Sequence, residues 1–314
     1  MIRHDTIRQG LFRFALAVVL LVCGGAHGAS AAGECRPFRI VDGDYAGPRQ
    51  FDRGLLWKLS RGGGGASSFL FGTIHVADER IVDLPDPVAE ALDQSEVFVM
   101  EVAPDAGQIL LMTERMFFGD EQRLDVLLPK SLYARAVDIL SAYNLPEEAI
   151  ATMKPWAAYL TMSYPPDMRS VLDLQLMQKA LERGARIQGL ESLEEQGSVF
   201  NDLELDDQLQ LLTDAVCHYE TSTGDFERMK ALYLDRDLKG LYEYGQRYVF
   251  EDNSLYERLT ERLLTRRNTT MAERMIPILR EGAAFVAIGA MHLPGEEGVL
   301  QRLKREGFAV ERVY

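Results

Sequence analysis

Two histidines, His75 and His292, each follow an apolar run and each stand three residues after a glycine. The two segments, GTIH at 72–75 and GAMH at 289–292, lie near opposite ends of the chain. The chain has five histidines, and two of them, His4 and His27, fall in a segment with the features of a cleaved leader. Of the other three histidines, two therefore occupy the same sequence context, an apolar run followed by Gly-x-x-His. A single Gly-x-x-His is weak evidence for a functional site, whereas two matched copies indicate one.

Two carboxylates follow apolar runs in the same way. Glu101 follows the run at 97–100, and Glu191 follows the run at 186–190. A carboxylate beside a buried strand is costly unless it is paired or solvated. Two imidazoles with one or two carboxylates suit a divalent ion such as manganese, cobalt or zinc, which can activate water for hydrolysis. The same groups could instead act without metal, as a general base and its orienting acid.

A structural explanation competes with the functional one for each of these residues taken alone. A histidine after a strand is more often a hydrogen-bonded structural group than a ligand, and we place His218 in that class. Arg267 and Asn268 follow a charged helical run. Either could bind a substrate carboxylate or carbonyl, although a solvated helix face explains Arg267 equally well. Gln196, five residues after Glu191, could reach the same site.

Four short apolar runs, each leading to one of the candidates, predict strands. They lie at 69–71, 97–100, 186–190 and 285–288. The runs at 97–100 and 285–288 are apolar throughout, which is typical of strands covered on both faces by helices. If the four strands are parallel neighbours, their carboxyl ends bring the four candidates to one crevice. The glycine before each histidine would let backbone or substrate approach closely.

Helices are predicted around these strands. Capping and charge patterns predict helices over 86–95, 171–183 and 296–305, followed by a strand at 308–313. The segments 106–166 and 203–267 have helical spacing, so we expect them to be helical insertions in one domain over 32–314. The fold class is therefore α/β, with a central mixed, partly parallel sheet flanked by helices. With 47% apolar residues, the chain can bury one large core or two small ones.

A glycine run at 62–65 separates two segments that resemble strands, 54–60 and 67–73. This arrangement predicts a hairpin loop. The run lacks the Lys-Ser/Thr that follows a phosphate-binding loop, so the sequence argues against nucleotide binding.

Residues 1–31 contain three arginines, an apolar run at 14–22 and a small-residue end, which predicts a cleaved secretory signal peptide. The apolar run is shorter than the roughly 20 residues that a membrane span needs. We therefore expect a periplasmic or secreted protein that is not an integral membrane protein. Two cysteines then remain, Cys35 and Cys217, and an oxidising compartment would allow a disulfide between them.

The net charge is −14, and removal of three arginines and one aspartate with the leader makes it −16. Such an acidic chain disfavours nucleic acid and anionic membrane surfaces as partners. In a secreted protein, an acidic surface usually serves solubility alone.

Taken in order, these motifs resemble the TraB/GumN family, which includes the TIKI metalloproteases. The resemblance covers nearly all of the chain after the leader. It rests on FGTIH at 71–75 with Leu84-Pro85, Glu101, KPW at 154–156, GLES at 189–192 with Glu195-Gln196, Arg267-Asn268, and GAMHL at 289–293 with Gly295, Gly298 and Gly307.

The resemblance implies a fold similar to the erythromycin-esterase and haem-binding ChaN-like proteins. It also implies a set of site residues, namely His75, Glu101, Glu191, Arg267, Asn268 and His292. In the TIKI branch, manganese or cobalt supports hydrolysis of peptide bonds. By this resemblance we expect a metal-dependent hydrolase acting on a peptide or protein in the cell envelope or outside it.

Each site residue then has an expected role. The metal would be held by His75, Glu101 and His292, while Glu191 takes or gives a proton. The guanidinium of Arg267 and the amide of Asn268 would bind the oxyanion. Two other functions stay open: an esterase-like hydrolase that uses histidine and glutamate without metal, and a non-enzymatic protein that binds haem, a metal or another envelope ligand.

Overall fold

The computed structural model describes residues 35–41, 50–61, 66–103, 105–119, 121–166 and 171–314. The predicted signal peptide at 1–31 and the glycine run at 62–65 lie outside the described residues.

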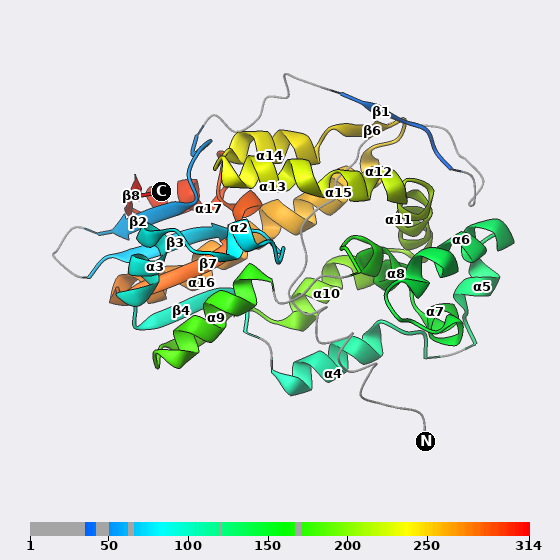
Figure 1. Cartoon of the computed structure of the whole chain (residues 1–314), viewed down its shortest axis with the longest axis horizontal. Coiled ribbons are helices and arrows are strands. Elements are labelled where there is room, and N and C mark those ends of the chain that lie inside the picture. The colour runs from blue at the N-terminus through cyan, green and yellow to red at the C-terminus, as the bar shows by residue number, and fades with distance from the viewer. Residues whose placement is uncertain (1–34, 42–49, 62–65, 104, 120, 167–170) are drawn as a thin grey trace.

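A six-stranded mixed sheet forms one half of the molecule, with strand order β5-β4-β7-β3-β2-β8 (Figure 1). The strands are β2 Leu56–Ser60, β3 Ser68–Thr73, β4 Val97–Val102, β5 Arg186–Glu191, β7 Ala284–Gly289 and β8 Ala309–Arg312. The four strands β5, β4, β7 and β3 are parallel, whereas β2 runs antiparallel to β3 and to β8. The predicted mixed, partly parallel sheet is confirmed.

The two strands with the most continuous apolar sequence lie in the interior of the sheet. Every residue of β4 and of β7 is buried, and Val99 of β4 pairs with Val286 of β7. Helices α3 (Asp86–Asp93) and α9 (Leu172–Glu182) cover one face, and α16 (Arg267–Glu281) covers the other (Figure 1). Burial from both sides explains why these strands need no polar alternation.

The last helix differs from its predicted start. We expected Glu296 and Glu297 to open it, but α17 runs from Val299 to Arg305, and the two glutamates form a turn before it. Their carboxylates pair with Arg305 and Arg302, so they bind side chains of the helix instead of capping its first turn.

Helices occupy most of the two long segments between the strands. The first contains α4 Ala106–Arg115, α5 Leu124–Leu127, α6 Lys130–Ser141, α7 Glu147–Thr152 and α8 Pro155–Met162. After β5 follow α10 Leu193–Asn201, α11 Leu205–Cys217, α12 Tyr219–Gly224, α13 Phe226–Leu234, α14 Leu238–Gly245, α15 Ser254–Thr260 and a π-helical turn Glu261–Arg266. Many of these helices pack around the fully buried Trp156 in a second core, distinct from the core of the sheet.

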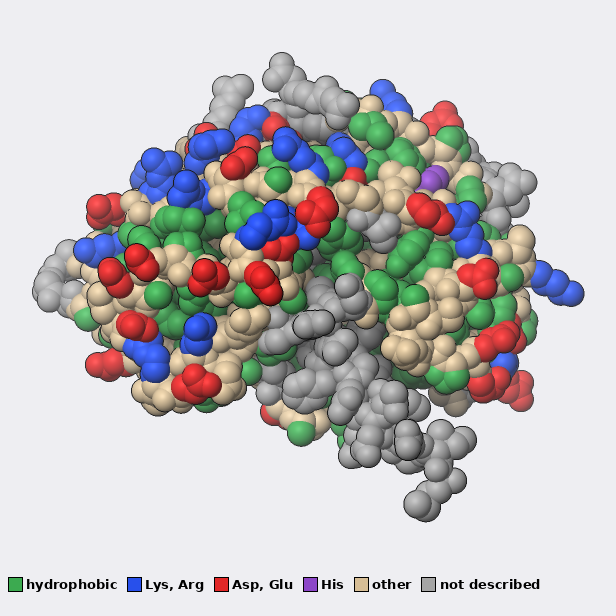
Figure 2. Space-filling model, viewed as in Figure 1, with side chains coloured by type: hydrophobic (Ala, Val, Ile, Leu, Met, Phe, Trp, Pro, Cys, Tyr) green, Lys and Arg blue, Asp and Glu red, His purple; other side chains and the backbone are tan. Residues whose placement is uncertain are grey.

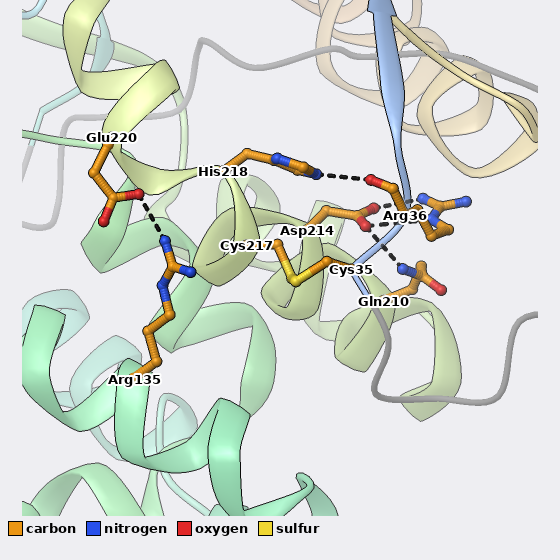
Figure 3. Close-up of a disulfide and its surroundings, with 8 residues drawn as sticks. All are labelled: Cys35, Arg36, Arg135, Gln210, Asp214, Cys217, His218 and Glu220. Carbon is orange, nitrogen blue, oxygen red and sulfur yellow. Dashed lines mark hydrogen bonds and ion pairs between the residues drawn. A yellow bond between two sulfur atoms is a disulfide. The ribbon is translucent and has the colours of Figure 1, made fainter.

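A short ribbon and a disulfide join the N-terminal segment to the second core. Strand β1 (Phe38–Ile40) pairs antiparallel with β6 (Tyr248–Phe250), a pairing that the sequence did not predict. The predicted disulfide between Cys35 and Cys217 is confirmed (Figure 3). Beside it, Nε2 of His218 lies 2.8 Å from the carbonyl oxygen of Arg36, which fits the structural role expected for this histidine.

Acidic and basic side chains are interspersed on the face of the molecule in Figure 2, where grey atoms cover part of the surface. Among the helices of the described part of the chain, none is both long and apolar enough to cross a membrane.

Candidate active site

The strand order places the four main candidates side by side at one edge of the sheet. From β5 to β3 these are Glu191 at the end of β5, Glu101 near the end of β4, His292 after β7 and His75 after β3. All four strands are parallel, so these residues lie at the carboxyl ends, where the loops of α/β sheets form ligand sites.

Arg267 lies between the two carboxylates and binds both. Its Nη2 donates to Oε2 of Glu101 at 2.5 Å and to Oε2 of Glu191 at 2.7 Å. Its Nε also lies 3.1 Å from each carboxylate oxygen of Glu191. The three side chains are at most 7% exposed. Two buried carboxylates can lie this close because the guanidinium offsets their charge.

Two further donors fix the carboxylates. The amide of Gln196 donates to Oε2 of Glu101 at 3.0 Å and to Oε2 of Glu191 at 3.2 Å. The backbone N–H of Gly289 donates to Oε1 of Glu101 at 2.7 Å. The structure therefore places Gln196, which the sequence suggested only faintly, at the centre of the cluster.

These contacts keep Glu101 ionised. Burial raises the pKa of its carboxyl group, but the charge of Arg267, together with His292, His75 and the N–H of Gly289, outweighs burial and lowers the pKa to about 2. The site therefore holds a fixed negative charge beside two imidazoles.

His75 is oriented by a residue that the sequence did not reveal, Asp173. Nδ1 of His75 lies 2.8 Å from Oδ2 of Asp173, and the hydroxyl of Thr73 donates to Oδ1 at 2.6 Å. Burial lowers the pKa of His75, but the Asp173 carboxylate raises it more, and the net shift is upward. The N–H of Leu172, at the start of α9, donates to the carbonyl oxygen of Val76 and brings Asp173 to the site.

The sequence contains only a weak signal for Asp173. It lies in the first turn of α9, where a favourable interaction with the helix dipole is sufficient to explain an acidic residue. Its partner His75 is 98 residues away.

His292 is oriented by Asn268. Nδ1 of the fully buried His292 lies 2.6 Å from Oδ1 of Asn268, whose amide group donates to the carbonyl oxygen of Glu297. Because this oxygen can only accept, the proton is on Nδ1 and the lone pair is on Nε2. Burial, and to a smaller extent Arg267, lowers the pKa of His292 to about 3 despite the nearby Glu101. The imidazole is therefore neutral near pH 7.

The Nε2 atoms of both histidines are buried and make no hydrogen bond to any described residue. Nε2 of His292 lies 3.8 Å from Oε1 of Glu101. Two such nitrogen atoms, each with Nδ1 held by another residue, fit the ligands of a metal ion. Among the described residues, however, no group of three or more His, Cys, Asp and Glu side chains is arranged to hold a metal. The ligand set of His75, Glu101 and His292 stays a prediction.

The π-helical turn before α16 helps to explain why consecutive residues reach two parts of the site. Arg266 pairs with Glu261 at the surface, whereas Arg267 and Asn268 are buried and contact the carboxylates and His292. A π turn changes the phase of the helix, and such turns are frequent at functional sites. The solvated-face explanation therefore holds for Arg266 and fails for Arg267.

The first Gly-x-x-His segment packs directly against the second. A Cβ atom at Gly72 would lie 3.0 Å from Cδ2 of Leu293 and 3.1 Å from Cα of Ala290. A larger residue here would require the turn that carries His292 to move by a few tenths of an ångström, because that turn lies against the backbone of Gly72.

The sequence is similar to proteins of one known family. A family model described as the TraB/PrgY/gumN family matches residues 55–312. The chain is 28% identical to metalloprotease TIKI2 of Danio rerio over 82% of this chain and 60% of that protein. It is 26% identical to human metalloprotease TIKI1 over 82% of this chain and 61% of that protein. The chain thus spans about 60% of the length of these relatives, and no solved structure matches it.

Proposed function

The chain belongs to the TraB/PrgY/gumN family, and from this membership and the buried site we propose that it is a metal-dependent hydrolase of peptide or amide bonds. The observation that carries the proposal is the pair of buried Nε2 atoms of His75 and His292, which have no hydrogen-bond partner in the part of the chain that the structure describes. Two relatives named as metalloproteases support the reaction class.

The metal would be manganese, cobalt or zinc, held by Nε2 of His75, Nε2 of His292 and Oε1 of Glu101. When bound there, such an ion would polarise the scissile carbonyl and lower the pKa of water. Asp173 fixes the direction of His75, and Asn268 fixes that of His292, so that both lone pairs are oriented in advance.

The remaining residues control charge and protons. Arg267 holds Glu101 and Glu191 together and supplies the positive charge that would stabilise an oxyanion. Glu191 is our candidate for proton transfer. Asn268 orients His292 through its amide oxygen and donates one N–H to the carbonyl oxygen of Glu297. Its amide group has a second N–H, which is our candidate for the expected oxyanion contact.

A second function is favoured by the pairing of His75 with Asp173. A carboxylate that orients an imidazole also occurs in hydrolases that use histidine as a general base without metal. For either reaction we propose a periplasmic or secreted location, which the disulfide supports because such bonds persist in oxidising compartments.

Metal stoichiometry, measured by mass spectrometry after dialysis against manganese, cobalt or zinc, tests the proposal. We expect one ion per chain, lost in the His75→Ala/His292→Ala variant and retained in the control His218→Ala. A peptide library should then be cleaved only with the ion present. Full cleavage after exhaustive chelation would support the metal-free hydrolase. Bound ligand without any turnover would instead indicate a binding protein.

A further inference from the structure

A small cavity opens beside His75, between the carboxyl edge of the sheet and two helices. Its walls come from the turns after β3 and β7 and from α13 and α14. Building on the proposed function, we propose that this cavity binds an apolar side chain of the substrate, next to the bond that is cleaved.

The lining is apolar. Helix α13 contributes Phe226, Met229 and Tyr233, which lie on one face because they are three and four residues apart. Leu241 of α14 and Met291 of the turn after β7 complete this wall.

Apart from His75, whose Nε2 the proposed metal would occupy, two polar side chains of the wall already have partners. The hydroxyl of Tyr233 donates to the carbonyl oxygen of Gly72 at 2.8 Å, and the hydroxyl of Thr73 donates to Asp173. No Asp, Glu, Lys or Arg is among the described residues that line the cavity. A charged substrate side chain would therefore lose its hydration without gaining a partner, whereas an apolar one would gain from burial.

The cavity shares residues with the candidate active site. His75 lines it, as does Gly289, whose N–H binds Glu101. A side chain bound in the cavity would therefore bring its own backbone next to the imidazole of His75. This continuity separates the cavity from a packing defect elsewhere in the core.

Two methionines in the wall predict that the cavity accepts apolar side chains of several shapes. Met229 and Met291 are unbranched and can adopt several rotamers, so the cavity can adjust to different ligands. We expect leucine, methionine and phenylalanine to be accepted, and aspartate and lysine to be rejected.

The test uses acetylated pentapeptide amides, Ala-Ala-X-Ala-Ala, with X as Leu, Met, Phe, Ala, Asp or Lys. Binding to full-length Glu191→Gln protein is measured by calorimetry, and kcat/KM is measured with the wild type. We expect the Leu peptide to exceed the Ala peptide by about 10- to 100-fold in both quantities, and the Asp and Lys peptides to fall below Ala.

Substitutions connect this preference to the cavity. Met229→Ala should reduce several-fold the preference for the Leu peptide over the Ala peptide, in affinity and in kcat/KM. Phe226→Ala, at a half-buried position, provides a second variant if the first does not fold. Leu232→Ala is the matched control, because this buried residue of α13 is not in the lining. If the peptides bind with an affinity that depends on X but none is cleaved, the proposed hydrolase activity is wrong and the proposed role of the cavity stands. If the affinity is the same for every X, or if no peptide binds, the proposed role of the cavity is wrong.

Discussion

The two site histidines differ in the group that holds Nδ1. A carboxylate, Asp173, holds His75, whereas a neutral amide, Asn268, holds His292. The carboxylate favours a protonated imidazole and the amide does not. The two imidazoles therefore differ in their response to charge and pH.

Replacing Asp173 with asparagine should weaken metal binding. The variant keeps a hydrogen-bond acceptor for His75 but loses the negative charge that raises the basicity of the ring. Groups that orient metal-binding histidines typically contribute 10- to 100-fold to affinity. We expect a change of that size in the Kd for manganese, cobalt or zinc, measured by calorimetry.

The matched control is Asp225→Asn, which alters another buried aspartate, bound by Tyr244 and Tyr248. That variant should lose stability and keep the affinity for metal. Equal changes in Kd in both variants would assign Asp173 a purely structural role.

The neutral His292 predicts a dependence of stability on pH. Its pKa is about 3 in the folded state and about 6.5 when unfolded, so below pH 6.5 the unfolded chain binds the proton and the folded chain does not. This group therefore removes about 1–2 kcal/mol of stability per pH unit between pH 6.5 and 3. His75, whose pKa is raised, acts in the opposite direction.

A comparison with His292→Gln isolates this effect. Urea unfolding of the metal-free proteins at pH 6.5 and pH 5 measures it. Between these pH values, the free energy of unfolding of the wild type should fall by about 2 kcal/mol more than that of the variant. Glu101, whose folded-state pKa is about 2, affects stability below about pH 4.5, mostly outside this window. Parallel pH curves for both proteins would contradict a neutral, buried His292.

At the scale of elements, the sequence predicted the strands better than their connections. The apolar runs of β4 and β7 had one explanation, burial on both faces, and the polar residues after the runs marked the carboxyl edge. Asp173 escaped prediction because its partner comes from a distant turn. The π-helical turn has no simple periodic signal, and β1 and β6, with three residues each, are too short for alternation to be recognised.

The contact between the two Gly-x-x-His segments predicts that Gly72→Ala disturbs the site. The added methyl group would press on Ala290 and Leu293, which flank His292 in the turn. Overpacking of this kind costs about 1–3 kcal/mol. We expect the free energy of unfolding to fall by that amount and the Kd for metal to rise, as measured by urea titration and calorimetry.

Gly224→Ala is the control, since no described atom from elsewhere in the chain lies within 4 Å of a Cβ atom at that helical position. It should keep the wild-type Kd and be as stable as the wild type or slightly more so. A Gly72→Ala protein with normal stability and metal affinity would show that the close packing of the two turns is unnecessary.

At the scale of the whole molecule, the disulfide and the candidate site lie in different parts of the structure. The site lies at the edge of the sheet, whereas the disulfide and the β1–β6 ribbon attach to the helical core. Phe38 of the ribbon packs edge-on against His218 and Tyr248, so the attachment also buries aromatic surface.

Removing the disulfide should therefore lower stability without altering the site. The bond joins residues 182 positions apart, and a loop of that length loses substantial conformational entropy when it is closed in the unfolded chain. We expect Cys35→Ser/Cys217→Ser to lower the free energy of unfolding by about 2–5 kcal/mol in urea titrations. At a temperature where the variant stays folded, its metal stoichiometry and Kd should match those of the wild type. A loss of metal binding in the folded variant would mean that the two cores are coupled, and that reduction of this bond can control the site.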